Sequence, residues 1–290
     1  MDLSGFEPEA SSMPRTQIVD NDKLSEYLNI IKLKGLTNKH IREVKRYLTS
    51  YLQYTDYRIK KPKSLEYFTY LKDNYSVSSY RKLTYQILKF LRHLKIEWAD
   101  EIKLPPDPVY YPTYISRDMI ESAIEYFRGH VYNIRFKALI SLGVDTGLRA
   151  EELYQLTTED IDIVNRVIHV NHNPQNGQST KTKQSRVSFF TNSTKGTLLE
   201  YLNFLDASSN LSSLFPQRWI ERKFRDAPIK VKQLRKYFSQ EWDRRGGPTS
   251  IKKILMGHSL KGDVDLMHYN FQSEEDLKKI YDKVMGTGSV

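Results

Sequence analysis

Three short motifs between Lys230 and Phe271 carry most of the information in this sequence. In chain order they are Lys232-Gln233-Leu234-Arg235, Met256-Gly257-His258-Ser259 and Met267-His268-Tyr269. A related motif lies upstream, Thr146-Gly147-Leu148-Arg149-Ala150-Glu151-Glu152-Leu153. Together the four supply two arginines, a lysine and a histidine that can gather around one tyrosine. Such a set suits attack of a tyrosine hydroxyl on a phosphodiester, because fixed cations stabilise the charge that develops on the phosphate.

Composition indicates a polyanionic partner. The chain has 290 residues, enough for about two domains, and 45 lysines and arginines against 35 acids give a net charge of +10. We therefore expect a nucleic acid as the partner, and no membrane, since no apolar run approaches the roughly 18 residues of a span. The chain has no cysteine, and its histidines lack zinc spacing, so we expect no metal and no cofactor. A reducing, cytoplasmic location fits this composition.

The sequence divides into four segments. Residues 1–18 contain glycine, proline and small polar residues and are expected to be a disordered leader. Residues 19–100 have helical periodicity, and residues 101–114 are dense in proline, which favours an extended linker. Residues 115–290 would form a second domain in which helices accompany a pair of strands. The predicted fold class is therefore mainly α with a small antiparallel β-sheet (α+β).

Four helices are expected in residues 19–100. Apolar residues recur there with a period near 3.6, and we expect Thr37 to cap the second helix, the third to begin at about Ser64 and the fourth to follow Ser76. Their polar faces combine tyrosines with basic residues, and the candidate DNA-binding residues are Lys39, Arg42, Lys45, Arg46, Arg81, Lys82 and Lys89. Any one of these could belong to an ordinary solvated face, but their shared sign favours DNA contact for the bundle as a whole.

Residues 115–290 are expected to alternate between helices and a hairpin. Ser116 is expected to cap a helix, and the apolar run 136–142 predicts a buried helix that ends at Gly143 or at Gly147. Residues 161–170 predict a strand, residues 171–183 a polar turn region and residues 186–190 the returning strand. Further helices are expected at about 195–205, 230–242, 250–256 and 273–285.

The motifs resemble the catalytic domain of the tyrosine recombinases, the phage-type integrase family, and among them the archaeal virus and plasmid integrases. The resemblance covers residues 115–285, with a looser helical similarity for residues 20–100. It implies a helical core-binding domain followed by a catalytic domain. It also implies a site-specific recombinase that cleaves and rejoins double-stranded DNA attachment sites through a 3′-phosphotyrosyl intermediate, integrating or excising a viral genome or mobile element. The family's enzymes need no cofactor and act as homo-oligomers on DNA, with a tetramer in the synaptic complex.

The same resemblance suggests a role for each motif residue. Arg149 and Arg235 would clamp the phosphate, and Glu152 would support the hydrogen bonds of the site. His258 matches the family's Gly-His box, and Tyr269 stands at the position of the nucleophile.

The resemblance also implies that a turn between the two expected strands would supply the general acid. Lys181 lies five residues before Arg186, as the family's general-acid lysine does before its own strand. Lys183 in the same turn is the alternative.

Two departures from the family pattern leave other functions open. Lys232 stands where most members have histidine, although archaeal viral integrases resemble this chain there. The spacing of 11 residues from His258 to Tyr269 is slightly longer than usual. The alternatives are a type IB topoisomerase and a DNA-binding protein that kept the fold without efficient catalysis. The helix expected after Tyr269 favours a recombinase, because it could dock on a neighbouring protomer.

Overall fold

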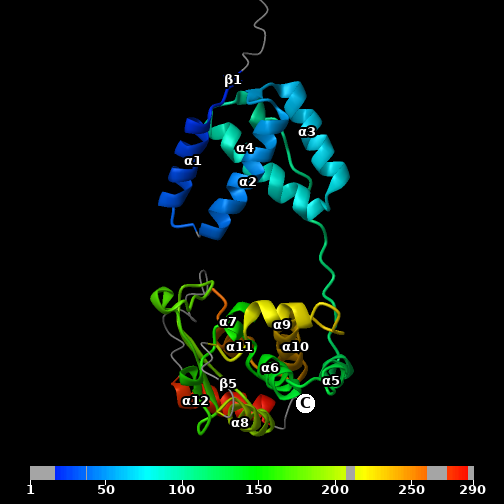
Figure 1. Cartoon of the computed structure of the whole chain (residues 1–290), viewed down its shortest axis with the longest axis vertical. Coiled ribbons are helices and arrows are strands. Elements are labelled where there is room, and N and C mark those ends of the chain that lie inside the picture. The colour runs from blue at the N-terminus through cyan, green and yellow to red at the C-terminus, as the bar shows by residue number, and fades with distance from the viewer. Residues whose placement is uncertain (1–16, 37, 207–212, 260–272, 287–290) are drawn as a thin grey trace, which may run out of the picture. The chain divides into compact units, whose positions relative to one another are not determined.

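The computed structural model describes residues 17–36, 38–206, 213–259 and 273–286. The chain forms two compact units that divide between Tyr111 and Pro112, inside the proline-rich segment. Both are built mainly from helices, with small antiparallel sheets, so the predicted α+β class is confirmed (Figure 1). Within the described ranges, no helix is both long enough and apolar enough to cross a membrane.

The first unit is a bundle of four helices. They are α1 (Asn21–Leu33), α2 (Asn38–Tyr54), α3 (Lys61–Asn74) and α4 (Val77–His93), followed by a short 3₁₀ turn, η1 (Glu97–Asp100). Ser76 caps α4 as expected, because its side chain accepts from the Ser79 N–H. Helix α3 begins three residues before the expected Ser64, since Pro62 fits the first turn of a helix. The expected cap Thr37 lies outside the described residues.

A small sheet in this unit was not expected. Strand β1 (Gln17–Ile18) pairs antiparallel with β2 (Arg58–Ile59), so residues 17 and 18 are ordered although the sequence placed them in the leader. The cause is tertiary, because the next residue, Val19, is 1% exposed and enters the core of the bundle. Its N–H also donates to the carbonyl of Tyr57 at 2.9 Å.

Helix α6 (Asn133–Thr146) is the centre of the second unit. Almost every one of its residues is buried, as expected for a helix that is apolar all round, and it packs against α8 (Asn192–Asp206) and α10 (Val231–Arg244). Gly143 does not end the helix. A Cβ there would lie 2.6 Å from the Leu234 side chain, so the glycine allows α10 to approach closely. The helix ends at Gly147, which has φ +63°.

The sheet of the second unit has three short strands instead of the two expected. Residues 161–170 form β3 (Ile161–Asp162) and β4 (Val167–Val170) with a tight turn between them, and β5 (Arg186–Phe189) pairs with β4 in the order β3-β4-β5. The turn forms because the Asp162 carboxylate accepts the Asn165 N–H at 2.9 Å. Arg166 then takes a left-handed conformation, with φ +59°.

The described residues of the second unit contain five further helices. They are α5 (Arg117–Tyr126), α7 (Ala150–Tyr154), α9 (Gln217–Lys223), α11 (Thr249–Met256) and α12 (Glu274–Met285), together with the 3₁₀ turns η2 (Thr158–Asp160) and η3 (Pro174–Asn176). Ser116 caps α5 as expected by accepting the Met119 N–H, whereas α9 was not expected.

Helix α12 packs on its own unit rather than presenting a free apolar face. Its residues Leu277, Tyr281 and Met285 are buried in a cluster with residues of β5, α10 and α11. Asp282 also forms an ion pair with Arg166 at 2.6 Å. Docking of this helix on a neighbouring protomer stays a prediction.

Candidate active site

The upstream arginine and its glutamate lie together at the start of α7. Gly147 turns the chain after α6, so Arg149 becomes the N-cap residue of α7. Its backbone N–H donates to Glu152 Oε2 at 2.8 Å, and its Nη1 donates to Glu152 Oε1 at 2.8 Å. The motif spacing of three residues therefore produces both a helix cap and an ion pair.

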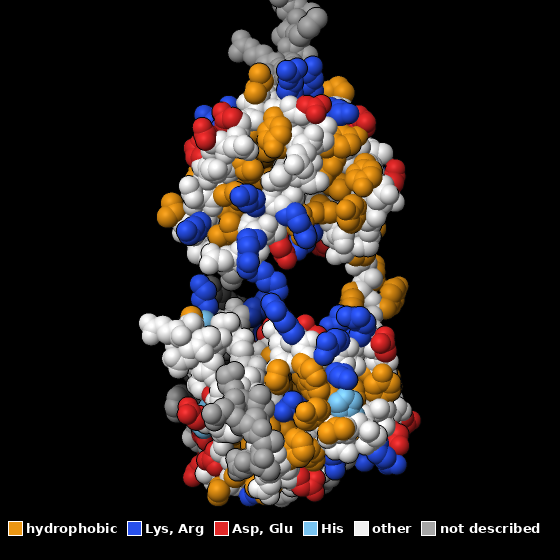
Figure 2. All heavy atoms as spheres, in the orientation of Figure 1, with side chains coloured by type: hydrophobic (Ala, Val, Ile, Leu, Met, Phe, Trp, Pro, Cys, Tyr) orange, Lys and Arg blue, Asp and Glu red, His pale blue; other side chains and the backbone are white. Residues whose placement is uncertain are grey.

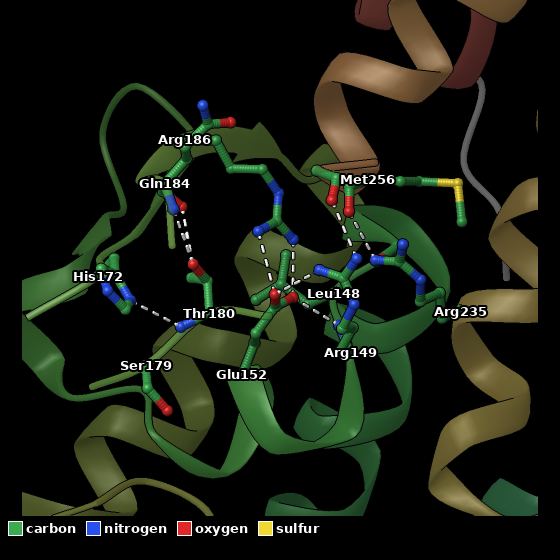
Figure 3. A network of polar contacts seen from close by, with 12 residues as sticks. Leu148, Arg149, Glu152, His172, Ser179, Thr180, Gln184, Arg186, Arg235 and Met256 are labelled. Atoms are coloured by element: carbon green, nitrogen blue, oxygen red, sulfur yellow. Dashed lines mark hydrogen bonds and ion pairs between the residues drawn. The ribbon is translucent and has the colours of Figure 1, made fainter. Parts of the chain in front are cut away.

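A third arginine, which the sequence argument used only as a landmark, completes this group. Arg186 on β5 donates to both carboxylate oxygens of Glu152, at 3.1 and 2.7 Å, and its Nε donates to the Leu255 carbonyl at 2.8 Å. The available signal was a charged residue at the start of an otherwise apolar returning strand. Figure 3 shows Glu152 between Arg149 and Arg186.

Glu152 stays ionised in this position. Burial alone would raise its pKa, but the hydrogen bonds and charge of Arg186, and then the hydrogen bonds of Arg149, lower the pKa of Glu152 to about 2. Its side chain is 2% exposed. A buried carboxylate with these partners acts as a fixed anchor that orients both guanidinium groups.

The downstream arginine of the site comes from α10. Arg235 Nη1 donates to the carbonyls of Gly147 and Met256 at 2.7 and 2.8 Å, and Arg149 Nη2 donates to the carbonyl of Gly257 at 2.9 Å. Removal from water, followed by repulsion from Arg149, lowers the pKa of Arg235 to about 10. The group is therefore still charged at neutral pH, and its lowered pKa reflects first its burial and then the nearby charge of Arg149.

The site has more positive than negative charge. Arg149 and Arg186 share the carboxylate of Glu152, whereas Arg235 donates to backbone carbonyls, so two of the three positive charges in this group are uncompensated. Arg149, Lys232 and Arg235 also line one cavity of about 500 Å³. An excess of arginine beside an open cavity suits the binding of a phosphate, because the planar guanidinium matches its oxygens.

His258 follows directly after α11. Gly257 caps this helix with φ +63°, and the His258 N–H donates to the carbonyl of Lys253. Loss of hydration, followed by the charges of Arg235 and Arg149, lowers the pKa of His258 below its ordinary value of 6.5. The imidazole is therefore neutral at neutral pH and can accept a proton.

Comparison with known proteins identifies the family. The model of the phage integrase family matches residues 113–270. The chain belongs to the phage integrase family. The prediction made from the motifs, that of a tyrosine recombinase of this family, is thereby confirmed.

Relatives and solved structures agree with this assignment. The tyrosine recombinase XerA of Saccharolobus solfataricus is 28% identical over 212 residues, which cover 71% of this chain and 69% of that protein. XerA of Pyrococcus horikoshii is 25% identical over 258 residues, which cover 87% and 84%. A lambda integrase dimer bound to a COC′ core site has a TM-score of 0.67 at 14% identity, covering 90% of this chain and all of that one. This last likeness concerns the fold.

The lysine-bearing turn of this phage integrase family member follows β4. Lys183 N donates to the carbonyl of Thr180 at 3.2 Å, so Lys181 occupies the corner of a turn, and both lysines are exposed. In the part of the chain that the structure describes, no contact joins either lysine to the three arginines. Lys232 is exposed at the cavity, and Tyr269 lies outside the described residues.

The seven candidate DNA-binding residues lie on α2 and α4 of the first unit, two helices that pack together. Two of them are paired with acids, Arg81 with Asp107 at 2.8 Å and Lys82 with Glu43 at 2.9 Å. Arg46 and Lys82 lie over the Tyr47 ring, at 5.3 and 5.7 Å from its centroid. Figure 2 shows the lysine and arginine side chains of this unit beside hydrophobic ones.

The described residues were also searched for groups that could bind a metal ion. Within residues 17–36, 38–206, 213–259 and 273–286, no group of three or more histidines and acids is placed to hold a metal ion.

Proposed function

We propose that this protein is a site-specific DNA recombinase that cleaves and rejoins attachment sites in order to integrate or excise a viral genome or mobile element. The observation that carries the proposal is a group of three arginines, two of them paired with one carboxylate, beside an open cavity. Such a group is costly to assemble unless an anion completes it. The phosphodiester of DNA is the anion that fits the chain's net charge of +10 and the DNA-bound integrases whose fold it shares.

The scissile phosphate would bind between Arg149 and Arg235. Among the described residues, the contacts of Arg235 involve only its Nη1, so its Nε and Nη2 hydrogens are available to a ligand. The three carbonyls that hold the two guanidinium groups fix them before substrate arrives. Preorganised donors of this kind stabilise the charge that develops on the two non-bridging oxygens in the transition state.

In the proposed cleavage step, the Tyr269 hydroxyl oxygen forms a bond to phosphorus while the bond from phosphorus to the 5′ oxygen breaks. Neutral His258 accepts the tyrosine proton, and Lys181 donates a proton to the departing 5′ oxygen. Rejoining is the reverse reaction with a different 5′ hydroxyl. The phosphotyrosyl ester conserves the energy of the broken bond, so the reaction requires no ATP or other cofactor.

Unit 1 would supply the core-binding domain. The basic residues of α2 and α4 would contact DNA phosphates, with Arg81 and Lys82 contributing less than the unpaired ones because acids neutralise them. Exchange between two duplexes cuts four strands, and each copy supplies one nucleophile, so four copies would assemble in the synaptic complex.

The arginine variants test this proposal. Suitable duplexes are recovered from a random-sequence pool as covalent adducts of the wild-type protein, then rebuilt as nicked suicide substrates. Arg149→Ala and Arg235→Ala should each slow single-turnover cleavage by roughly a hundredfold or more, and lysine at either position should rescue poorly, because a point charge cannot replace the planar fork. Arg222→Ala, an exposed arginine of α9, is the control for lost charge. Near-normal cleavage by Arg235→Ala would show that other groups hold the phosphate.

A further inference from the structure

The lysine-bearing turn is a closed loop with a defined shape. The Thr180 hydroxyl accepts the Gln184 N–H at 3.1 Å and donates to the Gln184 carbonyl at 3.0 Å. Lys183 takes the left-handed conformation, with φ +58°, as the last residue of a three-residue loop commonly does. Lys181, Thr182 and Lys183 therefore project from a short loop whose ends are tied together.

Two side chains outside the loop hold the backbone just before Lys181. Gln155 Oε1 accepts the Ser179 N–H at 2.7 Å, and His172 Nδ1 accepts the Thr180 N–H at 3.1 Å. Gln155 is the C-cap residue of α7, the helix that Arg149 caps at its N-terminus and that carries Glu152. Figure 3 shows His172, Thr180 and Gln184 in the same view as the arginine group. Consecutive amides are thus fixed to the catalytic unit immediately before the lysine.

His172 is well placed for this role because its own backbone is held on both sides. Its N–H donates to Ser185 Oγ at 2.9 Å, across the neck of the loop. The preceding Asn171 side chain donates to the buried carboxylate of Asp160 at 2.8 Å. The Asp160 carboxylate also accepts from the Gln178 amide at 2.9 Å. The imidazole therefore extends from the fixed segment after β4 to the backbone amide of Thr180, next to Lys181.

We propose that His172 is a positioning residue for the general-acid lysine, acting through the hydrogen bond from the Thr180 N–H to its Nδ1. The inference rests on the proposed function. A proton donor must lie within hydrogen-bond reach of the departing 5′ oxygen, and a displacement of about 1 Å can cost a hundredfold in rate. Only a neutral imidazole has a nitrogen that can accept, so Nδ1 carries no proton and Nε2 carries it.

The test uses two variants of His172 and two substrates. His172→Ala removes the acceptor, whereas the side-chain oxygen of His172→Asn lies close to the position of Nδ1 and can accept the same N–H. His169→Ala, in the same hairpin on β4, is the control. The substrates are a suicide duplex with the normal bridging 5′ oxygen and one in which sulfur replaces it. A thiolate leaves without a proton, so the second substrate bypasses the general acid.

We expect His172→Ala to cleave the oxygen substrate roughly tenfold to a hundredfold more slowly than wild type. It should cleave the sulfur substrate at the wild-type rate and retain normal DNA affinity. His172→Asn should recover most of the oxygen-substrate rate. The double variant His172→Ala/Lys181→Ala should cleave no more slowly than Lys181→Ala, because both changes impair the same step, proton donation to the 5′ oxygen. A structural defect would slow both substrates alike.

Other results would overturn the inference. Unchanged cleavage by His172→Ala, a defect that sulfur does not repair, or effects that add to those of Lys181→Ala would each exclude the positioning role. Lys183→Ala is measured in parallel, and rescue of that variant in place of Lys181→Ala would transfer the general-acid role within the loop. If wild type cleaves but sulfur rescues neither lysine variant, this inference fails while the proposed function stands. If wild type forms no adduct with any duplex, the proposed function itself fails.

Discussion

At the scale of single residues, Glu152 determines the geometry of the site. One carboxylate receives Arg149 and Arg186, which come from a helix cap and from a strand. The contact with Arg149 is local, because the two residues are three apart at the start of one helix. The contact with Arg186 could not be predicted, since it depends on how β5 lies against α7.

The pH dependence of stability should reveal this carboxylate. Its pKa of about 2 lies below the ordinary 4.5, so its stabilisation is complete above about pH 4.5 and is lost as the pH falls toward 2. Glu152→Gln should lower the free energy of unfolding at pH 6 by on the order of 3 kcal/mol. The difference in the free energy of unfolding between wild type and Glu152→Gln should become smaller as the pH falls to 3, as measured by urea denaturation. The exposed neighbour variant Glu151→Gln should show no such narrowing, and a constant gap for Glu152→Gln would contradict the assignment.

At the scale of elements, the long helices could be predicted and the two-residue strands of the first unit could not. The first residues of α4 and α5 could be predicted from Ser76 and Ser116, because an N-capping side chain is a local signal. Strands β1 and β2 have two residues each and form because Val19 is buried in the bundle. Such pieces depend on tertiary contacts, which leave no periodic pattern in the sequence.

Gly257 joins the end of α11 to the active site, and its replacement should therefore do more than distort a cap. With φ +63°, a side chain is strained there, and a Cβ would lie 2.8 Å from Arg186 Nε. Gly246 has φ +73° but open space around it. Gly246→Ala should cost only the conformational term of about 1–2 kcal/mol. Gly257→Ala should lower the free energy of unfolding further and slow cleavage, because Arg186 must move. If both substitutions lowered the free energy of unfolding by the same amount, the Arg186 side chain would be shown to move aside at no cost.

At the scale of the whole molecule, the chain combines a basic helical unit with a unit that contains the arginine group. The sequence was sufficient to assign the family, since its motifs keep their order and the family model covers residues 113–270. The sequence could not show that α12 packs on its own unit, because the apolar face of an amphipathic helix does not specify which surface it packs against.

The central claim is that this arrangement cuts DNA through Tyr269, and trapping the covalent product tests it most directly. Wild-type protein is incubated with a nicked suicide duplex, the adduct is digested, and the nucleotide-bearing peptide is sequenced by mass spectrometry. We predict a phosphotyrosyl bond at Tyr269, and no adduct from Tyr269→Phe despite nearly unchanged DNA affinity. An adduct on another tyrosine, or one that persists in Tyr269→Phe, would contradict the account.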